Sequence, residues 1–164
     1  MRRTLASTLF VGLVLSISVP ASAVRPVREF LPQEDEVISG ICPFDLGIYV
    51  LENESFITTF FDKDGNVTKL LITGRLVVEL RNEQTGASHV ADISGPGKVT
   101  FTEDSEVLTA LGNWLLFFFP GELGESEPGR AFLTSGRVVV EFSAEGAAIL
   151  EQRGRQVDVC ALLS

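Results

Sequence analysis

Few side chains in this sequence are suited to acid–base chemistry, and one of them is the sole histidine, His89. Strand alternation puts His89 on the same face as Ala91 and Ile93, so its imidazole could point inward and act as a general base. A surface histidine, or one hydrogen-bonded inside a core, would show the same pattern. The spacing identifies no Ser-His-Asp triad, since triads are recognised by geometry.

Glu79 and Glu141 hold matching positions in a weak internal repeat, in which LITGRLVVEL at 71–80 resembles LTSGRVVVEF at 133–142. Each glutamate shares a strand face with an arginine and a valine. If that face looked inward, the two carboxylates could serve as acid and base. The opposite face is uniformly apolar and makes the better core, so we expect the arginines and glutamates to form exposed cross-strand ion pairs.

Asp62, Asp64 and Asn66 match the opening of a calcium-binding loop. Such a loop needs Gly at its sixth position and Glu at its twelfth, where this chain has Val67 and Thr73. The flanking residues also have the pattern of strands, whereas a calcium loop of this kind joins two helices. We therefore expect a hairpin turn, with weak calcium binding as the alternative, and we expect no cofactor.

The most apolar run after the N-terminus is GNWLLFFFP, residues 112–120. It predicts a buried strand that is apolar on both faces. One face must line the interior, and the other must be covered by residues 24–36, by a ligand or by a partner, or else form an exposed patch. The aromatic excess suggests a site for a small apolar ligand, with Tyr49, Trp114, Phe117 and Phe119 as the expected contacts.

The elements that would position these side chains are strands, because no window shows sustained helical spacing with caps. Polar connections separate the expected strand segments, which cover residues 37–41, 45–51, 56–61, 67–82, 87–102, 106–119, 130–142 and 147–160. The five longest segments have a glycine near the middle: Gly74, Gly95 or Gly97, Gly112, Gly136 and Gly154. Such glycines, aligned across neighbouring strands, would let a sheet fold over on itself.

The two cysteines of the chain, Cys42 and Cys160, predict a disulfide if the chain is exported. Linked Cα atoms must lie within about 7 Å, so the first and last strands would be neighbours. A meander whose ends meet is a closed barrel, which also removes exposed edges. We therefore expect an all-β, antiparallel up-and-down barrel of about eight bent strands, with an orthogonal sandwich as the alternative.

The N-terminus has the pattern of a secretory signal peptide, with a basic start, a short apolar run over residues 9–19 and Ala-Ser-Ala at 21–23. The apolar run is too short for a comfortable membrane span. We expect secretion after cleavage near Ala23. The expected organisation is a signal peptide over residues 1–23, an extended leader over 24–36 and a single barrel domain over 37–164.

The charge of the chain is acidic, with 13 Lys and Arg against 22 Asp and Glu and a net charge of −9. This balance argues against nucleic acid and anionic membranes as partners. It also favours solubility outside the cell. The expected partner is a small apolar molecule, and self-association is left open.

Three stretches, ISGPGKVTF, GNWLLFFFP and LTSGRVVVEF, together with a cysteine near each end of the mature chain, resemble a family of small exported proteins of high-GC Gram-positive bacteria. The resemblance covers most of the mature chain. It implies export and a β fold and supplies no catalytic residues. The bent meander is similar in architecture to lipocalins and to the allene oxide cyclase and dirigent barrels. The lipocalin G-x-W signature is missing from the first strand, so no site is carried over.

Three functions are compatible with these features. The leading hypothesis is a secreted module that binds a small apolar ligand, which requires a cavity of at least a few hundred cubic ångströms. The second is an enzyme of the barrel isomerase or cyclase type that uses His89 or an inward glutamate. The third is a structural or interaction protein of the cell envelope that docks through the GNWLLFFFP strand. A binding protein is favoured over an enzyme.

Overall fold

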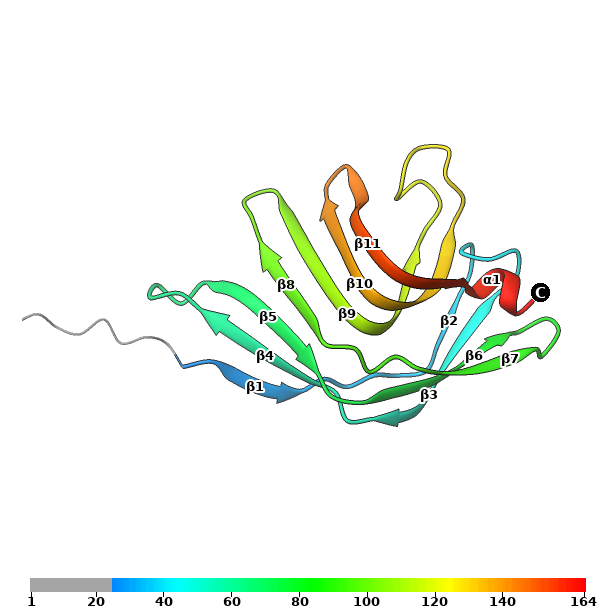
Figure 1. The fold of residues 1–164 in the computed structure, drawn as a ribbon, viewed down its shortest axis with the longest axis horizontal. Helices are drawn as coiled ribbons and strands as arrows, with labels where there is room; N and C mark the ends of the chain where they lie inside the picture. The colour runs from blue at the N-terminus through cyan, green and yellow to red at the C-terminus, as the bar shows by residue number, and fades with distance from the viewer. Residues whose placement is uncertain (1–24) are drawn as a thin grey trace, which may run out of the picture.

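The computed structural model describes residues 25–164, and the predicted signal peptide and its cleavage site lie outside this part of the chain. Eleven strands form two antiparallel sheets (Figure 1). The larger sheet consists, in spatial order, of β1 (Val27–Phe30), β4 (Phe56–Phe61), β5 (Val67–Thr73), β8 (Gly97–Phe101), β9 (Ser105–Phe118), β10 (Arg130–Ser143) and β11 (Gly146–Asp158). The smaller sheet consists of β2 (Glu36–Ile38), β3 (Leu46–Asn53), β6 (Leu76–Asn82) and β7 (Ser88–Asp92).

The strand count exceeds the prediction because two expected strands are each divided at a glycine. Residues 67–82 break at Gly74 into β5 and β6, and residues 87–102 break around Gly95 into β7 and β8. The register of β5 with β8 continues into that of β6 with β7, so Gly74 and Gly95 hold opposite positions at the break. At this point, called the glycine corner below, the chain passes between the two sheets. In addition, part of the expected leader forms β1.

The predicted alignment of glycines is found in the last three strands, which bend without breaking. Gly136 is the register partner of both Gly112 and Gly154, and all three have positive φ angles. Figure 1 shows the resulting U shape of β9, β10 and β11. The neighbour of Gly112 on the other side is Gly95 rather than the expected Gly97, since the Gly95 Cα lies 3.6 Å from where a Cβ on Gly112 would stand.

The bend and the corner create two hydrophobic cores. One lies inside the bend of β9–β11 and contains Leu116, Phe118, Phe132, Val138 and Val140. The other contains residues of the smaller sheet and its flanking segments, of the start of β10 and of the end of the chain: Ile38, Ile41, Cys42, Phe44, Leu46, Val78, Leu80, Ala91, Ala131, Val159 and Leu163. Each fully buried Val, Leu or Phe contributes roughly 1.5–3 kcal/mol, so both cores stabilise the arrangement of the two sheets.

The predicted disulfide between Cys42 and Cys160 is present, with 5.3 Å between the two Cα atoms. Cys160 lies in the short helix α1 (Val159–Leu162), not in a strand as expected. The strand ends at Asp158 because its carboxylate caps the helix by accepting from the Ala161 amide at 2.9 Å. Within residues 25–164, no helix has the length and apolar character that a membrane crossing requires.

The disulfide ties the segment between β2 and β3 of the smaller sheet to the helix that follows the last strand of the larger sheet. The antiparallel all-β fold and the disulfide are therefore confirmed. The two cysteines belong to segments of different sheets, so their proximity does not by itself require one continuous ring of strands. Closure of the strands into a single barrel stays a prediction.

Candidate ligand-binding site

A pocket of about 290 Å³ lies at the glycine corner, between the smaller sheet and β9; we call it the corner pocket. Its walls are mainly apolar and come from four parts of the chain. They include Ile48, Val50, Leu76 and Val78 from the smaller sheet, Ile72 from β5, Ile93 from the link between β7 and β8, and Trp114, Leu115 and Phe117 from β9. Its exposed side is lined by Leu31, Gln33, Glu34 and Glu36, which belong to the segment of residues 31–36 that we call the leader strap.

The leader strap is held in place by hydrogen bonds at both ends. At one end the Leu31 amide donates to the Ser55 carbonyl, and the Asn53 side chain donates to the Leu31 carbonyl, both at 2.9 Å. At the other end the Asp35 carboxylate accepts from the Val50 amide at 2.8 Å. These bonds fix the segment that the sequence suggested only as an extended leader, and they make it one side of the pocket.

Trp114, the only tryptophan of the chain, packs closely against two glycines, Gly95 and Gly97. A Cβ at Gly97 would lie 2.4 Å from the indole ring, and one at Gly95 would lie 2.5 Å from it. Gly97 therefore makes room for the indole of Trp114. This packing explains the glycine at position 97 better than a role in bending the strand does. The indole Nε1 is buried and has no hydrogen-bond partner among the described residues. Leaving such a donor unpaired costs roughly 1–3 kcal/mol.

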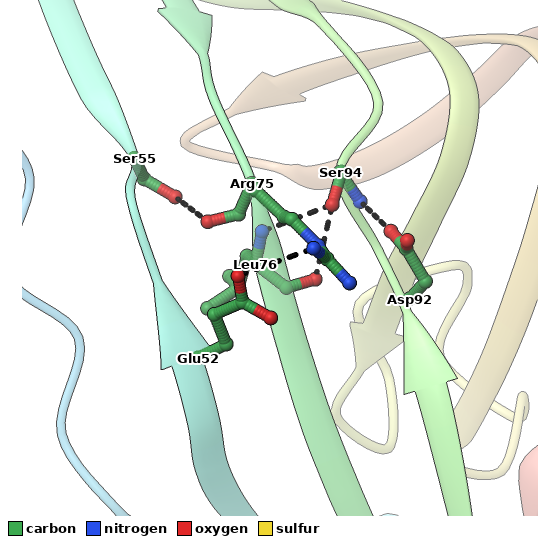
Figure 2. Close-up of polar contacts among 6 residues, drawn as sticks. All are labelled: Glu52, Ser55, Arg75, Leu76, Asp92 and Ser94. Carbon is green, nitrogen blue, oxygen red and sulfur yellow. Dashed lines mark hydrogen bonds and ion pairs between the residues drawn. The ribbon is translucent and has the colours of Figure 1, made fainter.

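The backbone next to the pocket is held by Ser94, as Figure 2 shows. Its hydroxyl accepts from the Leu76 amide at 3.0 Å and donates to the Leu76 carbonyl at 3.3 Å. The Leu76 carbonyl still accepts from the Ile93 amide at 2.9 Å, so the hydroxyl supplies the partner that the Leu76 amide needs at the strand break. The Ser94 amide in turn donates to the Asp92 carboxylate at 3.0 Å, and hydrogen bonding from Ser94 holds the pKa of the Asp92 carboxyl below its usual value.

The other side of the break is held by Arg75. Its guanidinium pairs with the Glu52 carboxylate at 3.2 Å, and its carbonyl accepts from the Ser55 hydroxyl at 3.4 Å (Figure 2). The ion pair is largely exposed, so it contributes at most about 1 kcal/mol. Together with Ser94, these contacts fix the wall of the corner pocket at the point where the two sheets separate.

Of the four expected ligand contacts, the structure places Trp114 and Phe117 in the wall of the corner pocket. Tyr49 is not among the residues that line it. It alternates with Ile48 and Val50 along β3, and its hydroxyl donates to the Glu83 carboxylate at 3.0 Å. This hydrogen bond raises the pKa of Tyr49 above its usual value.

The fourth expected contact, Phe119, lies just beyond the end of β9 and is 42% exposed. Its ring contacts that of Phe117 edge to face, with 6.2 Å between the ring centroids. Phe119 is not among the residues that line the corner pocket. On the same face Leu115 packs against the core at the smaller sheet, so only the end of this face is open to solvent.

His89 is exposed on β7, an edge strand of the smaller sheet. It lines a separate open groove of about 460 Å³, together with Asp92, Asn113 and Arg155. Trp114 lines this groove as well, so the indole separates the groove from the corner pocket. His89 does not line the corner pocket, and its imidazole is exposed in an open groove whose other walls include Ala91, Leu133 and Val157, so it is not the enclosed, inward base that strand alternation allowed.

The two matched glutamates make polar contacts outside the corner pocket. Glu79 pairs with Arg81 at 2.8 Å, and hydrogen bonds from Ser88 and Arg81 lower its pKa. Glu141 accepts from the Ser105 hydroxyl at 2.8 Å. In the second copy of the repeat, the arginine forms a cross-strand ion pair, between Arg137 and Glu151 at 3.0 Å, as Arg75 does in the first.

Residues Asp62, Asp64 and Asn66 form a hairpin turn between β4 and β5. The Asp62 carboxylate accepts from the amides of Asp64 and Asn66 at 2.8 and 2.9 Å, and from the Asn66 side chain at 3.0 Å. These donors lower the pKa of Asp62. Over residues 25–164, no group of three or more His, Cys, Asp or Glu side chains is arranged to hold a metal ion.

Sequence reasoning missed two parts of the corner pocket. The leader strap brings Gln33, Glu34 and Glu36 to the exposed side of the corner pocket. In the sequence these polar residues look like any solvated surface segment. The strand residues around the glycine corner, such as Ile72 and Ile93, have the same alternation as core residues elsewhere. The signal for the pocket that the sequence did contain was the pair Gly74 and Gly95. When two neighbouring strands break at opposite glycines, space opens that side chains do not fill.

Comparison of this chain with protein-family models, with curated protein sequences and with solved structures finds no match. The resemblance to small exported proteins of high-GC Gram-positive bacteria therefore stays a prediction, and the candidate site rests on the geometry of this chain.

Proposed function

We propose that the protein is a secreted binding module that holds a small apolar molecule in the corner pocket. The observation that supports this most is the pocket itself, about 290 Å³ in volume and walled by aliphatic and aromatic side chains. Ligand pockets in proteins usually measure roughly 300–1,000 Å³, so this one suits a ligand smaller than a typical drug molecule. Trp114 and Phe117 supply flat surfaces for an apolar chain or ring.

Burial of apolar surface would supply the binding energy. Each CH₂ group that leaves water contributes about 0.8 kcal/mol, so a short alkyl chain gains several kcal/mol against the cost of being immobilised. The disulfide and the hydrogen-bonded leader strap keep the walls in place before the ligand arrives. A pocket that is already formed binds more tightly than one that the ligand must order.

The proposal includes export of the protein and a barrel architecture. The Cys42–Cys160 disulfide is typical of an oxidising compartment, which agrees with the predicted signal peptide. A closed barrel would place the corner pocket in its wall or mouth, as in barrels that hold one small ligand. The binding proposal itself needs only the local geometry of the corner.

The two alternative functions have weaker support. A barrel isomerase or cyclase would need His89 or a glutamate at the base of a cavity, and His89 instead lies exposed beside an open groove. An envelope protein that docks through the GNWLLFFFP strand would use Phe117 and Phe119, which are 36% and 42% exposed. Size-exclusion chromatography tests that alternative, since docking of this kind between copies would give a dimer.

The test of the binding proposal is a titration with octanol, followed by the fluorescence of Trp114, the only tryptophan in the chain. We expect a saturable change in emission. Phe117→Ala should weaken binding about fivefold, because it removes roughly 1 kcal/mol of aromatic contact. The matched control is Phe101→Ala on β8, which removes a ring with the same 36% exposure away from the pocket.

The control variant should bind octanol as the wild type does. A wild-type titration that shows no saturable change by fluorescence and no heat by calorimetry would rule out the binding function. Equal losses in the two variants would place octanol somewhere other than the corner pocket.

A further inference from the structure

The charged side chains that line the corner pocket are all of one sign. Glu34 and Glu36 stand on its exposed side, and none of the described lining residues is Lys, Arg or His. Neither glutamate forms an ion pair among the salt bridges of the described residues. Two carboxylates without a cation thus stand at the edge of an apolar pocket.

The position of these carboxylates follows from the way the leader strap is anchored. Asp35, between them in the sequence, turns its carboxylate to the Val50 amide at 2.8 Å. Its two neighbours line the pocket instead. Glu36 also begins β2 and is the register partner of Ile48, a residue of the pocket wall. The backbone that carries both glutamates is therefore fixed over the pocket.

The aromatic side chains of the pocket have the same preference for positive charge. Trp114 and Phe117 line the pocket, and the face of an aromatic ring carries the negative side of its quadrupole, which attracts alkylammonium groups. Phe117 is 36% exposed, so part of its ring is accessible at the opening. The net charge of −9 adds a weaker attraction for cations over the whole molecule.

We propose that the corner pocket selects amphiphilic cations: an apolar body lies between the smaller sheet and β9, and an ammonium group lies at Glu34 and Glu36. This inference rests on the proposed binding function and adds the class of ligand. A fatty acid of the same length would bring its carboxylate against two others. A neutral alcohol would fill the apolar walls but would bring no positive charge to the two glutamates.

The experiment compares three ligands with one alkyl chain, octylamine, octanol and octanoate, at pH 7 by calorimetry and by Trp114 fluorescence. We expect octylamine to bind about five to ten times more tightly than octanol at low salt, from two exposed carboxylate contacts and one aromatic face. Octanoate should bind most weakly. The advantage of octylamine should shrink in 0.5 M NaCl, because salt screens exposed charges.

The variant Glu34→Gln with Glu36→Gln tests the assignment, and its readout is the ratio of the octylamine and octanol affinities. We expect this ratio to fall to within about twofold of one. The matched control is Glu103→Gln with Glu106→Gln, which removes the same charge near the β8–β9 turn, away from the corner pocket. The control should keep the wild-type ratio, which separates a local contact from the effect of net charge.

Each failure has a distinct meaning. If the three ligands bind equally, or octanoate binds most tightly, the preference for cations is wrong and the binding function stands. An unchanged ratio in the Glu34 and Glu36 variant overturns the assignment of the ammonium group to these two glutamates. If none of the three ligands binds, the proposed function fails, and the inference fails with it.

Discussion

At the scale of single residues, Gly136 shows most directly how the sequence produces the bend. Its φ is +134°, and a Cβ there would lie 2.2 Å from the Arg153 carbonyl oxygen. Gly136→Ala therefore adds both backbone strain and a collision with a neighbouring strand. We expect a loss of about 3 kcal/mol in the free energy of unfolding, measured by urea denaturation.

Gly86→Ala is the control for that substitution. Gly86 also has a positive φ, +77°, but nothing lies within 4 Å of where its Cβ would stand. Gly86→Ala should lose only the free energy of unfolding that comes from backbone strain at a positive φ, about 1 kcal/mol. If both variants lost the same free energy, the close packing of the glycines between strands would not be what shapes the sheet.

Tyr49 is the only tyrosine in the chain, so its titration can be followed directly by absorbance. The hydrogen bond to Glu83 raises its pKa, and the midpoint should therefore lie above the usual value of about 10. Because the folded-state pKa is the higher one, stability from this bond is complete below the unfolded pKa and is lost as pH rises through the folded pKa. Glu83→Gln should move the midpoint down, and an unchanged midpoint would show that the bond does not form in solution.

The sequence predicted part of the candidate site at this scale. Trp114 and Phe117 stood out because their strand is apolar on both faces. Tyr49 was chosen for its aromatic character, although the alternation of Leu46, Ile48 and Val50 already indicated a core face that excludes it. The glutamates of the leader strap had no local signal, because their position depends on hydrogen bonds to distant strands.

At the scale of elements, the disulfide is the contact whose removal should affect the fold most. It closes a loop of 118 residues in sequence separation and joins segments that belong to different sheets. The entropy of the unfolded chain then predicts a loss of about 4–5 kcal/mol when the link is removed. Chemical denaturation of Cys42→Ala with Cys160→Ala measures this loss, and a change below about 1 kcal/mol would contradict a structural role for the link.

The glycine pattern predicted well where the strands change direction. It did not predict whether a strand bends without interruption or breaks at that point. In β9, β10 and β11 the ladder continues through the aligned glycines. At Gly74 and Gly95 it breaks. The break is held by its surroundings, because the Ser94 hydroxyl accepts from the Leu76 amide and Arg75 pairs with Glu52. Such compensation depends on contacts between segments far apart in the sequence.

At the scale of the whole molecule, composition and alternation were sufficient to predict an antiparallel all-β chain, and the cysteines were sufficient to predict their pairing. The division into two sheets could not be predicted from these features. The proximity of Cys42 and Cys160 is compatible with either one ring of strands or two packed sheets. The corner pocket is a product of that division: it lies where β5 and β6 separate and where the leader strap crosses the opening.

The binding of an apolar chain in the corner pocket is tested most directly by a crystal structure of the protein grown with saturating octanol. We predict electron density for the alkyl chain between Leu76, Ile93 and Trp114, with the hydroxyl end toward the leader strap. A structure in which neighbouring side chains fill this space, or in which octanol lies only elsewhere, would contradict the proposed function.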